Sequence, residues 1–142
     1  MEANNKMMIS FLNRSENEGF ARTAVAAFVA ELDPTVEEIA EIKTALSEAV
    51  SNAIIHGYEG VENGMVIVEC SLYDKTVELI VRDGGIGIEN VDKAKEPLYT
   101  SKPEQERSGM GFTVMEIFMD KLEVASQPGE GTQVRMVKRL GR

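Results

Sequence analysis

The segment Glu48-Ala-Val-Ser-Asn52-Ala-Ile-Ile-His56 places a carboxylate, an amide and an imidazole at four-residue intervals in an otherwise apolar pattern. At that interval successive side chains lie about 40° apart around an α-helix, so all three share one face. Asn52 offers a neutral, hard oxygen that suits Mg²⁺, and Glu48 is a candidate to accept the proton of a hydroxyl or water. The alternative is a solvated helix face on which His56 caps the C-terminal end.

A second polar feature, Asp83-Gly-Gly85-Ile-Gly87-Ile, follows a strand-like run that ends in Val81-Arg82. A carboxylate at this position can accept a hydrogen bond from an amino group such as that of adenine. The glycines remove side chains where the backbone must approach a ligand or adopt a positive φ. Because Asp-Gly turns are common, a plain loop after a strand is the competing interpretation.

A third feature, Gly109-Met110-Gly111-Phe112, opens a predicted helix, where backbone amides unobstructed by side chains suit phosphate. Arg107 is a candidate to neutralise a γ-phosphate, since its planar fork matches phosphate oxygens. Lys102 is a weaker candidate on the same segment, and a solvated surface role is the alternative for both cations. The pattern is neither a P-loop nor a Rossmann fingerprint. Together the three features predict a site that binds ATP and transfers its terminal phosphate.

The apolar spacing predicts two long helices in the first half of the chain. Ser15-x-x-Glu18 and Thr35-x-x-Glu38 are capping boxes that would start them. In the first helix Phe20, Ala24, Ala27 and Phe28 recur at helical spacing, and in the second the apolar face comprises Ile39, Ile42, Ala45, Leu46, Ala49, Ala53 and Ile54.

The same reasoning predicts an α+β two-layer sandwich, with helices on one face of a mostly antiparallel sheet, as a single domain of residues 1–142. The segment 89–108 is long for a connection and is typical of a lid. A hairpin turn is expected at 73–76. The expected strands are 7–13, 65–72, 77–81, 122–126 and 132–137, and the expected helices are 16–31, 34–57 and 109–120, the last with Phe112, Met115, Ile117, Phe118 and Met119 largely inward.

Composition narrows the classes of partner. The net charge of −9 argues against direct binding to nucleic acid or to an anionic membrane, although an acidic chain would be steered towards a basic DNA-binding protein. No apolar run approaches the ~20 residues that span a bilayer, and no secretory leader is visible. Cys70 is the only cysteine and lies in a strand-like run, so we expect a buried thiol and a cytoplasmic protein.

The three features resemble the N, G1 and G2 boxes of the GHKL ATPase superfamily, which includes histidine kinases, DNA gyrase, Hsp90 and mismatch-repair ATPases. Asn-Ala-Ile-Ile-His-Gly-Tyr at 52–58 and Glu-Arg-Ser-Gly-Met-Gly-Phe at 106–112 closely resemble the anti-sigma F family, the serine kinases of the sporulation switch in endospore-forming bacteria. The resemblance runs from Ser15 to Thr132, and the boxes show no departure from the pattern. It implies a Bergerat-type fold with Mg-ATP beneath a lid.

The resemblance also implies roles for individual residues. Glu48 would be the general base and Asn52 the Mg²⁺ ligand. Asp83 would recognise adenine, helped by Thr132 on a late strand. The remaining pocket and phosphate positions would be Gly85, Gly87, Lys102, Arg107, Ser108, Gly109, Met110 and Gly111.

Two protein partners are implied in the same way. One is sigma factor F, held inactive by a homodimer, and the other is an anti-anti-sigma protein of the STAS type, phosphorylated on a serine. Arg22 matches the first-helix arginine expected to meet both partners. By spacing, Glu18, Arg22, Ala26 and Ala30 form one stripe of low bulk, for which a solvated surface is the alternative.

Two other functions stay open. A histidine-kinase catalytic domain would need its phosphoacceptor on another polypeptide, because His56 is the only histidine of this sequence. A non-catalytic module in which nucleotide only sets the conformation of the lid would have no need of a base at Glu48.

Overall fold

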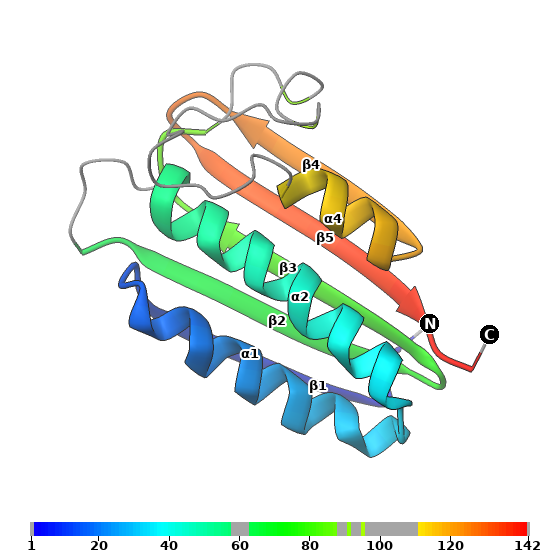
Figure 1. The fold of residues 1–142 in the computed structure, drawn as a ribbon. Helices are drawn as coiled ribbons and strands as arrows, with labels where there is room; N and C mark the ends of the chain where they lie inside the picture. The colour runs from blue at the N-terminus through cyan, green and yellow to red at the C-terminus, as the bar shows by residue number, and fades with distance from the viewer. Residues whose placement is uncertain (1, 58–62, 88–90, 92–94, 96–110, 142) are drawn as a thin grey trace.

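The computed structural model describes residues 2–57, 63–87, 91, 95 and 111–141 (Figure 1). Within them the chain forms five strands and the helices that cover them. The elements are β1 (Asn5–Leu12), α1 (Glu16–Val29), η1 (Ala30–Leu32), α2 (Val36–Asn52), η2 (Ala53–Gly57), β2 (Met65–Tyr73), β3 (Thr76–Asp83), α4 (Gly111–Phe118), β4 (Lys121–Gln127) and β5 (Gly131–Arg139).

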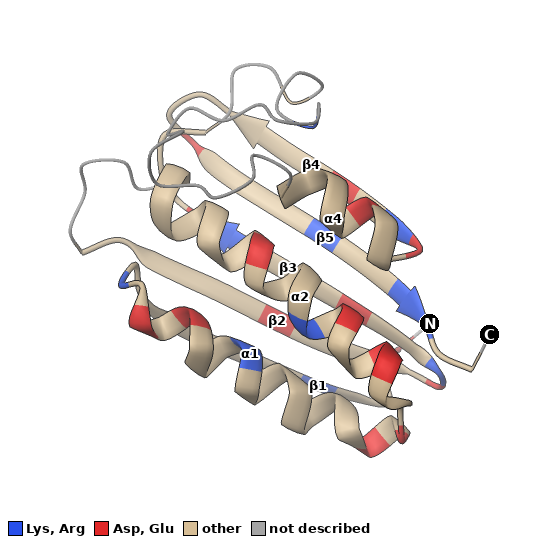
Figure 2. Cartoon of the chain, in the orientation of Figure 1, with Lys and Arg blue, Asp and Glu red and all other residues tan. Residues whose placement is uncertain are grey.

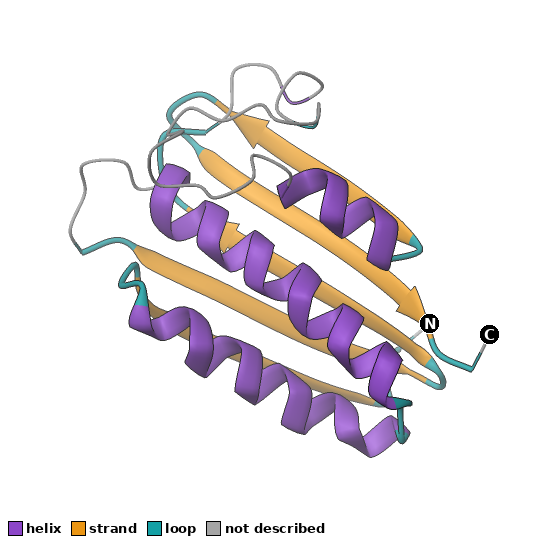
Figure 3. Cartoon of the chain, in the orientation of Figure 1, coloured by secondary structure: helices purple, strands orange, loops and turns teal. Residues whose placement is uncertain are grey.

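The strands form one sheet in the order β1-β2-β3-β5-β4, and every pairing between its described neighbours is antiparallel. The β2–β3 hairpin closes with Tyr73 opposite Thr76, as the sequence predicts. Figures 1 and 3 show α1, α2 and α4 lying side by side on one face of this sheet. The predicted two-layer α+β fold is therefore confirmed.

The core lies between the helices and the sheet. Val66, Val68, Cys70 and Leu72 alternate along β2 and are fully buried, because side chains two residues apart point to the same face of a strand. The thiol predicted to be buried is therefore in this core, and burial raises the pKa of Cys70 to about 12. The opposite face carries ion pairs, including Arg82–Glu69 at 3.3 Å.

The buried face of α2 agrees with the sequence prediction, whereas the buried face of α1 differs from it. On α2, Ile42, Ala45, Leu46 and Ala49 are buried as expected, together with Val50, and Ala53 is buried at the start of η2. On α1 the buried stripe is Ala21, Val25 and Val29, whereas Phe20 is 57% exposed and Ala27 is also exposed. The predicted α1 face is therefore wrong at Phe20 and Ala27, whereas Phe28 packs against the core as predicted.

The two capping boxes also differ. Thr35 caps α2 as predicted, because its hydroxyl accepts from the amide of Glu38 at 3.0 Å and the Glu38 carboxylate accepts from the Thr35 amide at 2.9 Å. Ser15 makes no side-chain cap, since its backbone is already helical. The Glu18 carboxylate instead pairs with Arg22 at 3.1 Å, so the first capping box was wrong.

Helix α4 packs against α2 through its inward side chains. Met115 is fully buried and Met119, just beyond the helix, nearly so. Ile117 is 68% exposed, which corrects its predicted inward position. Because α4 ends at Phe118, the last residues of the predicted helix lie in the turn that leads to β4.

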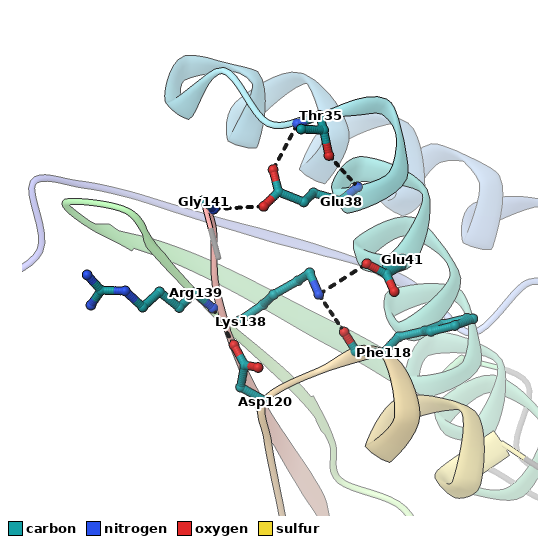
Figure 4. Close-up of polar contacts among 8 residues, drawn as sticks. All are labelled: Thr35, Glu38, Glu41, Phe118, Asp120, Lys138, Arg139 and Gly141. Atoms are coloured by element: carbon teal, nitrogen blue, oxygen red, sulfur yellow. Dashed lines mark hydrogen bonds and ion pairs between the residues drawn. The ribbon is translucent and has the colours of Figure 1, made fainter.

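The C-terminal end of the chain is tied to the start of α2. The Glu38 carboxylate that completes the Thr35 cap also accepts from the Gly141 amide at 2.8 Å (Figure 4). These backbone hydrogen bonds, with the larger contribution from Thr35, lower the pKa of Glu38. The cap of α2 and the end of β5 are thus held by one carboxylate.

A second polar contact joins β5 to α4 and α2. Lys138 is largely buried and reaches Glu41 of α2 at 3.3 Å and the carbonyl oxygen of Phe118 at 2.8 Å (Figure 4). Nearby, the Arg139 amide donates to Asp120 at 2.6 Å. A cation at the carbonyl end of a helix is electrostatically favourable. Lys138 therefore holds the ends of β5 and α4 against α2.

Candidate functional site

Asp83 is the last residue of β3 and lies opposite Thr132 of β5 in the sheet register. Its side chain lies on the helix-facing side of the sheet, like that of Val66 across the β2 pairing. The Gly85 amide donates to Asp83 Oδ1 at 2.9 Å. Burial raises the pKa of Asp83, while the backbone hydrogen bonds from Gly85 and Thr132 oppose the rise. The result is a half-buried carboxylate held in a fixed orientation by its own loop.

The end of the second helix is packed directly onto this carboxylate. A Cβ on Gly57 would lie 2.6 Å from Asp83 Cγ, closer than packed carbon atoms approach. The Gly57 carbonyl accepts from the Ile86 amide at 2.8 Å, and a Cβ on Gly85 would lie 1.6 Å from that carbonyl oxygen. Residues 57 and 85 must both lack a side chain for the helix end and the Asp83 loop to meet.

Gly87 has a φ of +78°, which agrees with the predicted need for a positive φ. A Cβ there would lie 2.1 Å from the Gln127 carbonyl oxygen at the end of β4. The close approaches at Gly85 and Gly87 are thus between segments of this chain. Approach of a ligand to the same backbone stays a prediction.

Glu48 and Asn52 lie one turn apart near the end of α2, and both side chains are half-buried. The α-helix ends at Asn52 and continues as a π-helical turn, η2, that contacts β3 and β5. In a π-turn each hydrogen bond spans five residues, so η2 departs from the α-helical geometry on which the shared face with His56 was predicted. The predicted shared face holds for Glu48 and Asn52, and the π-turn carries the chain on to Gly57.

The phosphate end of the predicted site falls mainly outside the described residues. Gly111 is buried at the first position of α4. Lys102, Arg107, Ser108, Gly109 and Met110 lie outside the described residues, so their predicted contacts with phosphate stay predictions.

Sequence reasoning missed two residues at the predicted adenine end of the site. Gly57 was predicted only as the end of the second helix, and its contact with the Asp83 loop joins segments distant in the chain. Ser126 of β4 lies opposite Thr132 in the sheet register, and their hydroxyl oxygens are 2.7 Å apart. Its position in the last strand pair was the available signal.

The donor set suits a magnesium ion held mostly by phosphates. Among the described residues no group of three or more His, Cys, Asp or Glu side chains could hold a metal ion. Mg²⁺ beside a nucleotide needs only one or two protein oxygens, because phosphates and waters supply the rest. A single amide oxygen at Asn52 is compatible with that arrangement.

Comparison with known proteins places the chain in a family. The family model for the histidine kinase-like ATPase domain matches residues 11–138. An anti-sigma F factor from Clostridium perfringens is 62% identical over 136 residues, which are 96% of this chain and 97% of the relative. The chain belongs to the anti-sigma F factor family. Anti-sigma F factors from Caldanaerobacter subterraneus and Oceanobacillus iheyensis are 58% identical over 142 residues (100% of this chain, 99% of the relative) and 56% identical over 138 residues (97% and 94%).

Solved structures agree on the fold of this anti-sigma F family member. The crystal structure of the RsbU and RsbW domains of a Mycobacterium tuberculosis protein matches with a TM-score of 0.71 at 23% identity, over 98% of this chain and 33% of that one. The histidine kinase domain of a blue-light activated kinase from Erythrobacter litoralis matches with a TM-score of 0.55 at 20% identity, over 87% and 61%. These likenesses support the Bergerat-type architecture alone. Within the described ranges, every helix is too short or too polar to cross a bilayer.

Proposed function

We propose that this chain is an ATP-dependent protein serine kinase that also holds a sigma factor inactive. In this account Mg-ATP binds between α2 and the glycine turns that follow β3. The γ-phosphate passes to a serine of an anti-anti-sigma protein of the STAS type, and a homodimer of the chain binds sigma factor F in the cytoplasm of a sporulating cell. The similarity to anti-sigma F factors supports the anti-sigma role, and the ATPase family supports the use of ATP.

The proposal rests chiefly on the Asp83 carboxylate. It contacts Gly57, lies opposite Thr132 in the sheet and accepts a hydrogen bond from the Gly85 amide. Burying a carboxylate is unfavourable, which is why its pKa is raised. Such a group is expected where a ligand supplies a matching donor. The amino group of adenine is a donor of that kind. Because Gly57 contacts Asp83, a base bound to this carboxylate would lie near the end of the helix that carries Asn52.

Glu48 is proposed to remove the proton from the serine hydroxyl of the protein substrate. The serine oxygen then forms a bond to the γ-phosphorus, and the bond from that phosphorus to its bridging oxygen breaks to leave ADP. Arg107, Lys102, Ser108 and the amides of 109–111 would neutralise and orient the phosphates. Positioning and charge neutralisation supply most of the catalysis in such transfers.

Asn52 is proposed to hold Mg²⁺ through its side-chain oxygen. The ion, when bound, neutralises charge on the phosphate oxygens. Because Glu48 and Asn52 share one face of α2, the base and the metal ligand would lie on the same side of the bound triphosphate.

The proposed partner surface is on the helices. Acidic residues recur along α1 and α2 (Figure 2), and the net charge of the chain is −9. A DNA-binding partner such as a sigma factor is basic where it meets DNA and would be steered towards this field. Arg22 lies within the acidic surface, where its guanidinium is 3.1 Å from Glu18 and 3.5 Å from Ser47 Oγ. Its side chain is 42% exposed, so it remains accessible to a partner.

The test is incubation of the purified protein with radiolabelled ATP, Mg²⁺ and a purified STAS protein of the same organism, followed by identification of the labelled residue. The proposal expects label on one serine of the STAS protein. Nucleotide binding without label in the partner would favour the non-catalytic module. Label on a histidine of the partner, in place of a serine, would favour the histidine-kinase alternative.

A further inference from the structure

Ser126 and Thr132 form a hydroxyl pair beside Asp83. They lie opposite one another on β4 and β5, and Thr132 lies opposite Asp83 on the next strand. All three side chains therefore point to the helix-facing side of the sheet. Ser126 Oγ is 2.7 Å from Thr132 Oγ1 and 3.0 Å from the carbonyl oxygen of Gly131.

The two contacts of Ser126 favour one arrangement of the protons. A hydroxyl has one proton to donate, and a carbonyl oxygen can only accept. Ser126 donates to the Gly131 carbonyl oxygen, because without that proton two oxygens would face each other at 3.0 Å. The proton in the 2.7 Å contact then comes from Thr132. With its own proton committed to Ser126, the Thr132 hydroxyl can act towards a ligand only as an acceptor.

We propose that Ser126 is a specificity-determining residue that makes the site select a 6-amino purine over a 6-oxo purine. The inference deepens the proposed function, because it depends on a nucleotide binding at Asp83. An ionised Asp83 also only accepts, so the base would meet two acceptors side by side. The amino group of adenine carries two hydrogens and matches them, whereas the 6-oxo group of hypoxanthine or guanine would face them with lone pairs.

The experiment measures the dissociation constants of ATP and inosine triphosphate, with Mg²⁺, for each variant. Their ratio within one variant is independent of the fraction of protein that is folded, so a loss of stability does not mimic the effect. In Ser126→Ala, Thr132 can turn and donate to the 6-oxo group. We expect the preference for ATP to fall about 5-fold, the equivalent of one hydrogen bond.

Two variants test the route of the effect. Ser126→Thr keeps a hydroxyl at this position and should retain the preference of the wild type. In a Thr132→Val background, Ser126→Ala should no longer change the ratio, because the hydroxyl through which it acts is gone. Ser10→Ala, which removes an exposed hydroxyl from β1 at the other edge of the sheet, is the matched control and should leave the ratio unchanged.

An unchanged ratio in Ser126→Ala, with ATP still bound, would overturn this inference and leave the proposed function standing. If Ser126→Ala changed the ATP/ITP ratio equally in the wild-type and Thr132→Val backgrounds, the inference would also be overturned, because Ser126 would then act without the Thr132 hydroxyl. If the wild-type protein bound neither nucleotide, the proposed function itself would be contradicted.

Discussion

Gly57 and Asp83 lie in contact although they are far apart in the chain, with no room for a Cβ between the helix end and the carboxylate. The contact joins the helix that carries Glu48 and Asn52 to the strand end that carries Asp83. It sets the distance between the proposed catalytic end and the proposed adenine end of the site.

Gly57→Ala should therefore disturb both stability and nucleotide binding. A Cβ 2.6 Å from Asp83 Cγ must displace the carboxylate or the π-turn. We expect the free energy of unfolding to fall by about 1–3 kcal/mol, the usual effect of overpacking, and ATP affinity to fall more than the loss of folded protein explains. Urea unfolding and calorimetric titration measure the two effects.

The matched control for this variant is Gly19→Ala on α1. The nearest atom to a Cβ there is the end of the Arg22 side chain at 3.8 Å, so no clash arises. A helical Gly→Ala change of this kind should stabilise by up to about 1 kcal/mol and leave ATP affinity unaltered. Equal ATP affinity in Gly57→Ala and the wild type would show that the contact does not position Asp83.

The pH dependence of ATP binding should report the state of Asp83. Burial raises the pKa of Asp83 above its ordinary value of 3.8, so on acidification this carboxylate takes up its proton earlier than an exposed aspartate. The protonated form loses an acceptor, and ATP affinity should therefore decline as the pH falls through that raised pKa. Titration of ATP at a series of pH values measures the decline.

Asp83→Asn is the reference for that series. It should bind ATP more weakly at neutral pH and lack the part of the acid decline that belongs to Asp83. Protonation of the phosphates is common to both proteins and cancels in the comparison. Parallel curves for the two proteins would exclude Asp83 as the titrating group.

The stability of the fold in acid should depend on Glu38. Its folded pKa lies below the ordinary value of 4.5, because the Thr35 and Gly141 amides donate to the carboxylate. Its contribution is therefore present above pH 4.5 and is lost as the pH falls through the lowered pKa. Glu38→Gln should be less stable than the wild type at neutral pH and approach it in acid, as thermal melts across the series would measure.

Glu37, exposed on the same turn of α2, provides the control for Glu38. Glu37→Gln should lower the stability less than Glu38→Gln does, because among the described residues it is Glu38 that accepts from the Gly141 amide. A Glu38→Gln curve that ran parallel to that of the wild type down to the lowest pH would contradict the role given to this carboxylate.

Arg22→Ala should leave ATP affinity unaltered and weaken the complex with sigma factor F. An exposed arginine at the centre of a protein interface typically contributes about 2 kcal/mol, or roughly 30-fold in affinity. Surface-immobilised sigma factor gives the dissociation constant. The matched control is Arg139→Ala, which removes an exposed arginine from the end of β5. Equal effects of the two changes on the dissociation constant would contradict the assignment of Arg22 to the partner surface.

Local sequence pattern predicted most of the helices and strands. It failed where one pattern was compatible with more than one buried face. On α1, both the Phe20 series and the buried Ala21, Val25 and Val29 recur at helical spacing, because small apolar residues occur all around this helix. Periodicity alone could not choose between the two faces. The choice came from contact with the sheet, which fits the small residues and leaves Phe20 outside.

The site shows the same division between local and long-range information. The positions of Glu48, Asn52 and Asp83 on their helix and strand end followed from spacing, as did the positive φ at Gly87. The contact of Gly57 with the Asp83 loop joins segments distant in the chain. It depends on the π-turn after Asn52, for which the sequence carried no recognised signal.

The measurement that tests the central claim most directly is phosphoryl transfer by Glu48→Gln to the STAS serine, with ATP affinity measured on the same preparation. The account predicts ATP affinity within several-fold of the wild type and a transfer rate reduced by about 10²–10⁴-fold, the usual effect of losing a general base. Transfer at the wild-type rate by this variant would contradict the assignment of Glu48 as the catalytic base.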